Sequence, residues 1–161
     1  MTGQLSLRAI TSGDQPFLLA LVDSTRDDLS VLDRTLRGML VRLQHDAQAS
    51  DYRRRFPRME QNLVLADGAP AGRLYVARGT NEIRLVDISL LPAYRSQRIG
   101  ASLLARLQDE SRLSGLPLRL HVLQASPAVR LYRRLGFQPG AVDGLYQAME
   151  WHPLQPHLSK D

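Results

Sequence analysis

The spacing of apolar and polar positions changes several times along the first half of the chain, and each change predicts a new element. Residues 4–10 alternate apolar and polar side chains, as a half-buried β-strand does. Thr11 and Pro16 are typical of a helix start, and an apolar stripe with helical spacing follows. The stripe consists of Phe17, Leu18, Leu21 and Val22. A second helix is predicted from about Asp33, whereas residues 49–60 are polar and are expected to be irregular.

Short strands dominate the second half of the chain, and two helices interrupt them. The predicted strands are residues 62–66, 71–78, 82–91 and 117–123, followed by a hairpin of 137–141 and 145–151. The first helix runs from Ile99 to Gly115, a residue typical of helix C-termini. The second begins at Ser126 with Pro127 in its first turn, and it ends at Gly136.

The predicted order of elements is therefore β-α-α-β-β-β-α-β-α-β-β. Helices that cross between strands cover both faces of a sheet, so the pattern predicts an α/β fold with helices on both faces. A chain of 161 residues without an internal linker is expected to form a single domain, here over residues 1–151. Residues 152–161 carry two prolines and no periodicity, and we expect a loose tail.

The stretch PAYRSQRIGASLL, residues 92–104, joins a strand to the start of a helix. The first N–H groups of a helix have no partner within it, and they lie at the positive end of the helix dipole. Gly100 lacks the Cβ that would keep an anion at a distance, and Arg95 and Arg98 add positive charge. A phosphate site and a solvated basic helix start both remain open on these residues alone.

Composition narrows the classes of protein. A hydrophobic content of 43% with 23% charged residues is typical of a globular protein, and no segment approaches the ~20 apolar residues of a membrane span. The N-terminal stretch does not resemble a signal peptide, so we expect a cytoplasmic protein without membrane partners. The absence of cysteine excludes disulfides and thiol nucleophiles. The four histidines lack metal-ligand spacing, so no metal is predicted.

The net charge of +5 indicates an anionic partner, and arginine supplies all of the basic residues except Lys160. The arginines are scattered along the chain. The densest cluster, residues 52–58 (YRRRFPR), is short, and for that reason no nucleic-acid partner is predicted.

Three segments then resemble one known family. Residues 95–101 (RSQRIGA) resemble the [Q/R]-x-x-G-x-[G/A] pyrophosphate loop of the GNAT superfamily, the acyl-CoA-dependent N-acetyltransferases. The preceding DISLLPAYR is similar to that family's fourth strand, and residues 126–137 (SPAVRLYRRLGF) are similar to its N-P-A-x-x-L-Y-x-x-L-G-F segment. The resemblance covers residues 62–151 and implies a mixed, mostly antiparallel sheet. It also implies acetyl-CoA as co-substrate and a single-step transfer of the acetyl group to a primary amine.

The resemblance also assigns roles to individual residues. Tyr132 matches the tyrosine that protonates the leaving CoA thiolate. The residues that match CoA-binding positions are Ile88, Leu90, Arg95, Ser96, Gln97, Arg98, Ile99, Gly100, Ala101 and Ser126. Two of these depart from the family pattern, which has glycine at the position of Arg98 and asparagine at that of Ser126. Because a left-handed backbone is costly for arginine, we expect Arg98 to adopt an ordinary helical start.

A general base is predicted on the strand that leads to this loop. Some members of the family carry a catalytic glutamate there, and a gapless count back from Arg95 matches it to Glu82. The alternative is that Glu82 only pairs with Arg84 or Arg73. Asp87 on the same strand is the second candidate, provided that it is buried beside the cleft.

The identity of the acceptor stays open. Residues 24–61 are expected to wall the acceptor site, and they hold both arginines and carboxylates. Carboxylates would suit a cationic amine, and arginines would suit an acceptor that bears a carboxylate. A non-catalytic acyl-CoA-binding module is the alternative to an enzyme. Dimers are common in the family, so the resemblance also allows a homodimer.

Overall fold

The computed structural model describes residues 3–153, and these form two compact units. Unit 1 comprises residues 3–75 and 87–97, and unit 2 comprises residues 76–86 and 98–153. The pattern of the sequence did not indicate this division. The single domain over residues 1–151 stays a prediction, and most of the expected loose tail, residues 154–161, lies outside the described residues.

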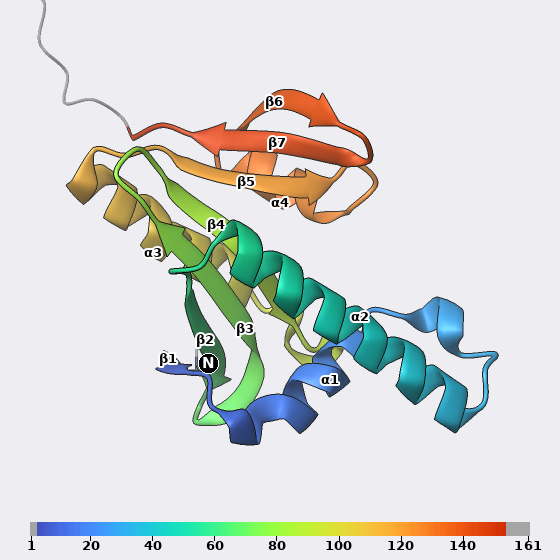
Figure 1. The fold of residues 1–161 in the computed structure, drawn as a ribbon. Helices are drawn as coiled ribbons and strands as arrows, with labels where there is room; N and C mark the ends of the chain where they lie inside the picture. The colour runs from blue at the N-terminus through green and yellow to red at the C-terminus, as the bar shows by residue number, and fades with distance from the viewer. Residues whose placement is uncertain (1–2, 154–161) are drawn as a thin grey trace, which may run out of the picture. The chain divides into compact units, whose positions relative to one another are not determined.

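The order of helices and strands confirms the predicted order (Figure 1). The elements are β1 (Leu5–Ala9), α1 (Gln15–Asp23), α2 (Arg34–Arg55), β2 (Glu60–Ala66), β3 (Ala69–Arg78), β4 (Ile83–Leu90), α3 (Ile99–Ser114), β5 (Leu118–Leu123), α4 (Ala128–Arg134), β6 (Gln138–Asp143) and β7 (Tyr146–Trp151). The strands form one sheet in the order β1-β2-β3-β4-β5-β7-β6. β4 and β5 pair in parallel, whereas β1 with β2, β5 with β7 and β6 with β7 pair antiparallel, so the expected mixed, mostly antiparallel sheet is confirmed.

In unit 1, α1 and α2 pack against each other (Figure 1). Val22, Leu29 and Val41 form the buried cluster between them. The carboxylate of Asp33 accepts a hydrogen bond of 2.8 Å from the backbone N–H of Leu36 and so caps the first turn of α2. The predicted start of this helix is therefore correct.

The prediction of irregular structure over residues 49–60 is wrong for its first part, because α2 continues to Arg55. No apolar stripe marks this last stretch. Asp51 accepts hydrogen bonds from Arg54 (2.7 Å) and Arg55 (3.4 Å) at helical spacing, which supports the final turns. Between these charges, Tyr52 turns inward and donates a hydrogen bond to Asp87.

The backbones of β3 and β4 approach each other closely within unit 1. A side chain at Gly72 would collide with the carbonyl oxygen of Ser89 and press on Leu90. The backbone N–H of Leu91 donates to the carbonyl of Ala71 at 2.9 Å in the same region. Gly72 therefore allows the end of β4 to lie against β3.

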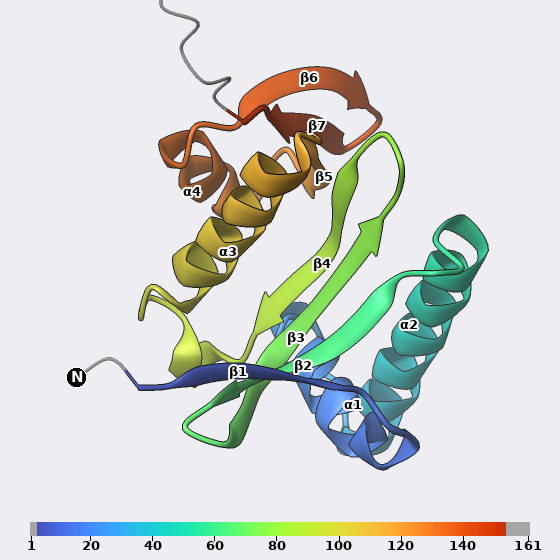
Figure 2. The same cartoon turned by 90° about the vertical axis from the view of Figure 1, so that its left-hand side faces the viewer.

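In unit 2, α3 and α4 lie on the same side of the layer formed by β5, β7 and β6 (Figure 2). β5 and β7 pair over six residues, from Leu118 opposite Trp151 to Leu123 opposite Tyr146. The core of the unit is made of large, fully buried side chains. They include Leu103, Leu104, Leu118, Leu120, Phe137 and Met149. Among residues 3–153, no helix is both long enough and apolar enough to span a membrane.

Candidate functional site

A short, internally bonded loop follows β4 in unit 1. Residues Pro92–Tyr94 form one turn of 3-10 helix. The Nε of Arg95 donates a hydrogen bond of 3.0 Å to the carbonyl of Leu90, and the side-chain amide of Gln97 donates one of 2.7 Å to the carbonyl of Ala93. These bonds hold the loop against the end of β4. Ile88 and Leu90 are half-buried in the adjoining part of that strand.

The backbone at Ser96 and Arg98 is left-handed, with φ of 61° at both residues. The expectation that Arg98 begins an ordinary helical turn is therefore wrong. Arg98 has a ψ of 13°, directly before α3, and its carbonyl accepts the hydrogen bond of Ser102 at 2.9 Å. Left-handed residues in such turns direct consecutive N–H groups into an anion-binding concavity. The chain adopts this conformation even with an arginine where the family has glycine.

We expect Arg98→Gly to leave the free energy of unfolding unchanged or to raise it by up to about 1.5 kcal/mol. Glycine relieves a left-handed strain of roughly 1–2 kcal/mol, but it adds a backbone entropy cost of about 0.5–1 kcal/mol. Arg98→Ala keeps the strain, so it should be less stable than the glycine variant in urea unfolding. A glycine variant less stable than the alanine variant would contradict the strain.

Gly100 lies in the first turn of α3, in unit 2. An ideal Cβ built at this position has the Cδ2 of Leu131 as its nearest neighbour, at 3.7 Å, which is an ordinary contact. The packing of the chain therefore does not itself require glycine at this position. A ligand that approaches the N-terminus of α3 closely would require it. Ile99 beside it is buried, and Ala101 is half-buried.

Tyr132 is buried in α4, with 5% of its surface exposed. Its ring packs edge-on against Phe137, with ring centroids 5.6 Å apart. At the start of the same helix, the Oγ of Ser126 accepts a hydrogen bond of 3.2 Å from the backbone N–H of Ala128. The N-cap residue of α4 is Pro127 rather than the predicted Ser126, but Ser126 still satisfies the N–H group of the first helical residue. Leu131, which Gly100 faces, is the chain neighbour of Tyr132, so the first turn of α3 lies next to α4.

Glu82 is held by two arginines in unit 2. It accepts hydrogen bonds from Arg84 at 2.7 Å and from Arg119 at 3.3 Å. Burial raises the pKa of the Glu82 carboxyl, but the hydrogen bonds and charges of the two arginines outweigh burial, so the pKa lies below its usual range. Glu82 is thus ionised at neutral pH and is a weakened base, and its assignment as the general base stays a prediction.

Asp87 is at the centre of a buried polar cluster in unit 1. One of its oxygens accepts hydrogen bonds of 2.8 Å from both Arg73 and Tyr52, and the other accepts one of 2.7 Å from Ser89. The side chains of Arg73 and Asp87 are only 5% and 10% exposed. The side chain of Asp87 is thus largely buried, and its role as the second candidate base stays a prediction. The sequence did not single out Arg73 as a partner of Asp87.

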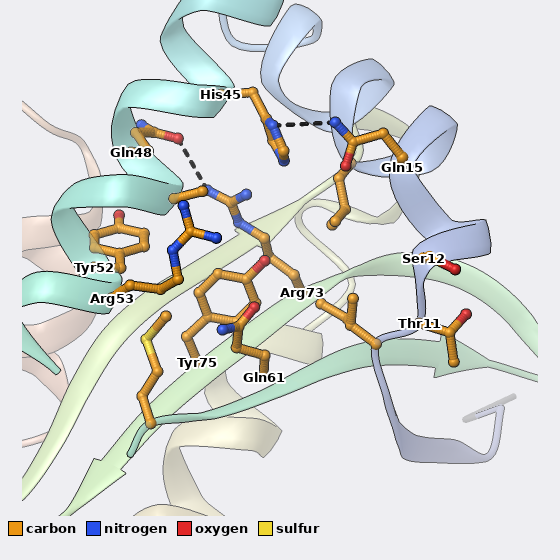
Figure 3. Close-up of a pocket in the computed structure, with 14 residues that line it drawn as sticks. Thr11, Ser12, Gln15, His45, Gln48, Tyr52, Arg53, Gln61, Arg73 and Tyr75 are labelled. Atoms are coloured by element: carbon orange, nitrogen blue, oxygen red, sulfur yellow. Dashed lines mark hydrogen bonds between the residues drawn. The ribbon is translucent and has the colours of Figure 1, made fainter. Parts of the chain in front are cut away.

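A pocket in unit 1 opens above this cluster, and we call it the helix-side pocket (Figure 3). It has a volume of about 260 Å³. Its lining comes from the loop before α1, from α1 and α2, and from β2 and β3. The polar lining includes Gln15, His45, Gln48, Gln61, Arg73 and Tyr75. Arg53 and Tyr52 also line it, from the final turns of α2 that the sequence analysis left irregular.

Comparison with known proteins identifies a matching family model and solved structures with a similar fold. The family model "Acetyltransferase (GNAT) domain" matches residues 60–139. No curated protein matches the chain significantly. Among solved structures, the chain is similar to PaiA N-acetyltransferase from Thermoplasma acidophilum in complex with coenzyme A, with a TM-score of 0.68 and 18% identity over 92% of this chain and 99% of that one.

Two other solved structures agree with this match. An acetyltransferase from Thermus thermophilus has a TM-score of 0.67 and 21% identity, and covers 95% of this chain and 99% of its own. The ribosomal-protein-S18-alanine N-acetyltransferase from Escherichia coli has a TM-score of 0.60 and 20% identity, and covers 98% of this chain and 100% of its own. At these identities, the likeness shows the fold.

Proposed function

Since the chain belongs to the GNAT acetyltransferase family, as its motifs predicted, we propose that it transfers an acetyl group from acetyl-CoA to a primary amine. The observation that carries this proposal is that the matched domain, residues 60–139, contains both the loop of residues 95–101 and Tyr132. A similar structure holding coenzyme A supports the choice of an acyl-CoA as donor. Cytoplasmic location and a homodimer stay predictions.

The residues proposed to bind acetyl-CoA follow one another from the end of β4 into α3. The backbones of Ile88 and Leu90 would pair with the amide groups of the pantetheine arm. Residues 95–101 would bind the pyrophosphate through the N–H groups of the loop and of the first turn of α3. The left-handed residues and the space at Gly100 suit an anion there. Ser126, half-buried before α4, would contact the arm as well.

Bound acetyl-CoA supplies a thioester that a neutral amine can attack. The new C–N bond forms at the thioester carbon, the C–S bond breaks, and the amine proton must pass to a base. Tyr132 is proposed to give its phenolic proton to the departing sulfur, because a phenol with a pKa near ~10 is protonated at neutral pH. No enzyme nucleophile is needed, in agreement with the absence of cysteine.

The direct test is release of CoA thiol from acetyl-CoA in the presence of a panel of primary amines. We expect release that depends on the amine and yields the N-acetyl product by mass spectrometry. Binding of acetyl-CoA without release, for every amine, would support the alternative of a non-catalytic acyl-CoA-binding module. Failure to bind acetyl-CoA would contradict both functions.

The pH profile of kcat/KM distinguishes the two candidate bases. If Glu82 is the base, kcat/KM falls at acidic pH where its carboxylate becomes protonated. Because the pKa of Glu82 is lowered, this acidic limb of the profile lies at a pH below the usual titration range of glutamate. Glu82→Gln should then remove this limb and lower kcat/KM about tenfold, less than is usual for a general base because the carboxylate is a weak one. Loss of the limb in Asp87→Asn instead would identify Asp87. An unchanged profile in both variants would contradict a carboxylate base on β4.

A further inference from the structure

The helix-side pocket has an uneven balance of charge. Two of its lining residues, Arg53 and Arg73, are cations, and none of the lining residues that the structure describes is an aspartate or a glutamate. Figure 3 shows the two arginine side chains directed into the pocket, Arg53 from α2 and Arg73 from β3. Asp87 neutralises one of these charges through its ion pair with Arg73. The charge of Arg53 remains, so the pocket attracts anions.

Arg73, which lines the pocket, has one hydrogen-bond donor without a partner among the described residues. Its Nη2 donates to Asp87 at 2.8 Å and to Gln48 at 3.2 Å. Its Nε is buried and has no hydrogen-bond partner among the described residues. The residue as a whole is only 4% exposed. A buried donor without a partner is costly, and native proteins seldom leave one unless a ligand or water completes it. This donor is therefore a point at which water or a ligand oxygen could complete the hydrogen bonding of Arg73.

The nearby carboxylates that would suit a cationic acceptor are engaged elsewhere. Asp23 forms an ion pair with Arg37 at 2.6 Å, and Asp28 forms one with Arg26 at 2.9 Å. Asp33 caps α2. None of the three lines the pocket. Asp46 contacts the lining residue His45 at 3.3 Å but does not line the pocket itself, whereas Arg53 does, so the charge of the lining favours an acceptor that bears a carboxylate.

The remaining lining suits a small polar molecule that has an anionic end. The ring of Tyr75 lies under the guanidinium of Arg73, 4.9 Å from centroid to Cζ. Burial raises the pKa of the Tyr75 phenol, so the hydroxyl stays protonated and can donate. A carboxylate accepts from an arginine fork and from such a hydroxyl together, whereas an ammonium ion cannot accept from either.

Two residues that line the pocket, Arg73 and Tyr52, are hydrogen-bonded to β4, the strand proposed to hold acetyl-CoA. Asp87, which both Arg73 and Tyr52 contact, is the chain neighbour of Ile88 on β4. An acceptor seated on Arg73 would thus lie next to the strand that carries the thioester arm. Resting on the proposed acetyl transfer, we propose that the helix-side pocket binds the acceptor and selects an amine that also bears a carboxylate, held by Arg53 and Arg73.

The first test compares matched acceptors in the thiol-release assay. The probes are glycine, β-alanine, the standard L-amino acids and the carboxamides of each, so that a neutral amide replaces the charged carboxylate within each pair. Rates are compared at equal concentrations of neutral amine, because the carboxamide also lowers the pKa of the amine. We expect kcat/KM for the best acid to exceed that for its amide by about tenfold to a hundredfold. Amides or simple monoamines that react as well as the acids would overturn the selection, while acetyl transfer itself would stand.

The second test uses a signal that does not depend on turnover. In ¹⁵N-labelled protein, the N-acetyl derivatives of the same acids are titrated without CoA, and the Nε–H resonance of Arg73 is followed by NMR. Acids should shift this resonance at concentrations where amides do not. Arg53→Gln should weaken acid binding about tenfold, and Arg54→Gln, an exposed neighbour paired with Asp51, should leave it unchanged.

The two tests fail in different ways. If acids shift the Arg73 signal but no amine releases thiol, the acetyl transfer is wrong, and with it the acceptor role of the pocket. If thiol is released but acids leave the Arg73 signal unmoved, the transfer stands and the carboxylate site is overturned. An equal loss of affinity in Arg53→Gln and Arg54→Gln would also overturn the site, because it would reflect the charge of the helix alone.

Discussion

Gly100→Asp should raise the dissociation constant for CoA at least about a hundredfold and leave the fold intact. The change places a methylene group and a carboxylate at the N-terminus of α3, where we propose that the pyrophosphate binds. Like charges in contact and a blocked approach both oppose binding. Stability should be preserved, because a Cβ at this position meets only the Cδ2 of Leu131 at 3.7 Å. An aspartate in the first turn also interacts favourably with the helix dipole, by about 0.3–1 kcal/mol.

Isothermal titration with CoA and thermal unfolding of the same sample check this expectation. Gly38→Asp is the matched control, because Gly38 lies in α2 and a Cβ there meets nothing within 4 Å. This control should bind CoA as the wild type does. Gly100→Ala separates size from charge, and we expect it to bind with an affinity between those of the wild type and Gly100→Asp. Wild-type affinity in Gly100→Asp would refute the assignment of the loop.

Tyr132→Phe should lower kcat about a hundredfold and leave the affinity for acetyl-CoA unchanged. The phenyl ring of the variant keeps the edge-on contact with Phe137 and fills the same buried space. The phenolic hydroxyl is lost, and without its proton the thiolate must depart unprotonated. Steady-state kinetics with acetyl-CoA and titration calorimetry measure the two quantities separately.

A conservative control is available for this variant. Tyr146 lies on β7 with half of its surface exposed, so Tyr146→Phe should leave kcat unchanged. An unchanged kcat in Tyr132→Phe would exclude the general-acid role and leave Tyr132 as a core aromatic. A loss of acetyl-CoA affinity in step with kcat would instead indicate that the hydroxyl positions the donor.

The order of elements was predictable because each element carries its own local signal. Gly115 ends α3 in a left-handed conformation with φ of 75°, and Asp33 caps α2. The last turns of α2 were not predictable in this way. Residues 49–55 carry no apolar stripe, and what supports them is the pairing of Asp51 with Arg54 and the contact of Tyr52 with Asp87 in β4. The second of these depends on tertiary structure.

In the candidate site too, the residues with a local sequence signal were predictable, and those that depend on tertiary contacts were not. The loop and Tyr132 were found because their residues are close in sequence and match a known pattern. The helix-side pocket was missed because Arg73 and Asp87 are 14 residues apart on neighbouring strands, and Gln48 is 25 residues from Arg73 on a helix. An arginine within an otherwise apolar strand was the one local sign of a buried charge. Its partner became evident only from the structure.

The sharing of β3 and β4 between two units also sets an order of events during synthesis on the ribosome. All residues of unit 1 precede Arg98, so unit 1 can begin to fold while the rest of the chain is being made. The 64 residues that follow Gln97 take about 3–13 s at ribosomal speeds of about 5–20 residues per second. Residues 76–86 belong to unit 2 and must wait. Until then Val76, Ile83 and Leu85, all buried in the finished protein, lack the packing partners that unit 2 supplies.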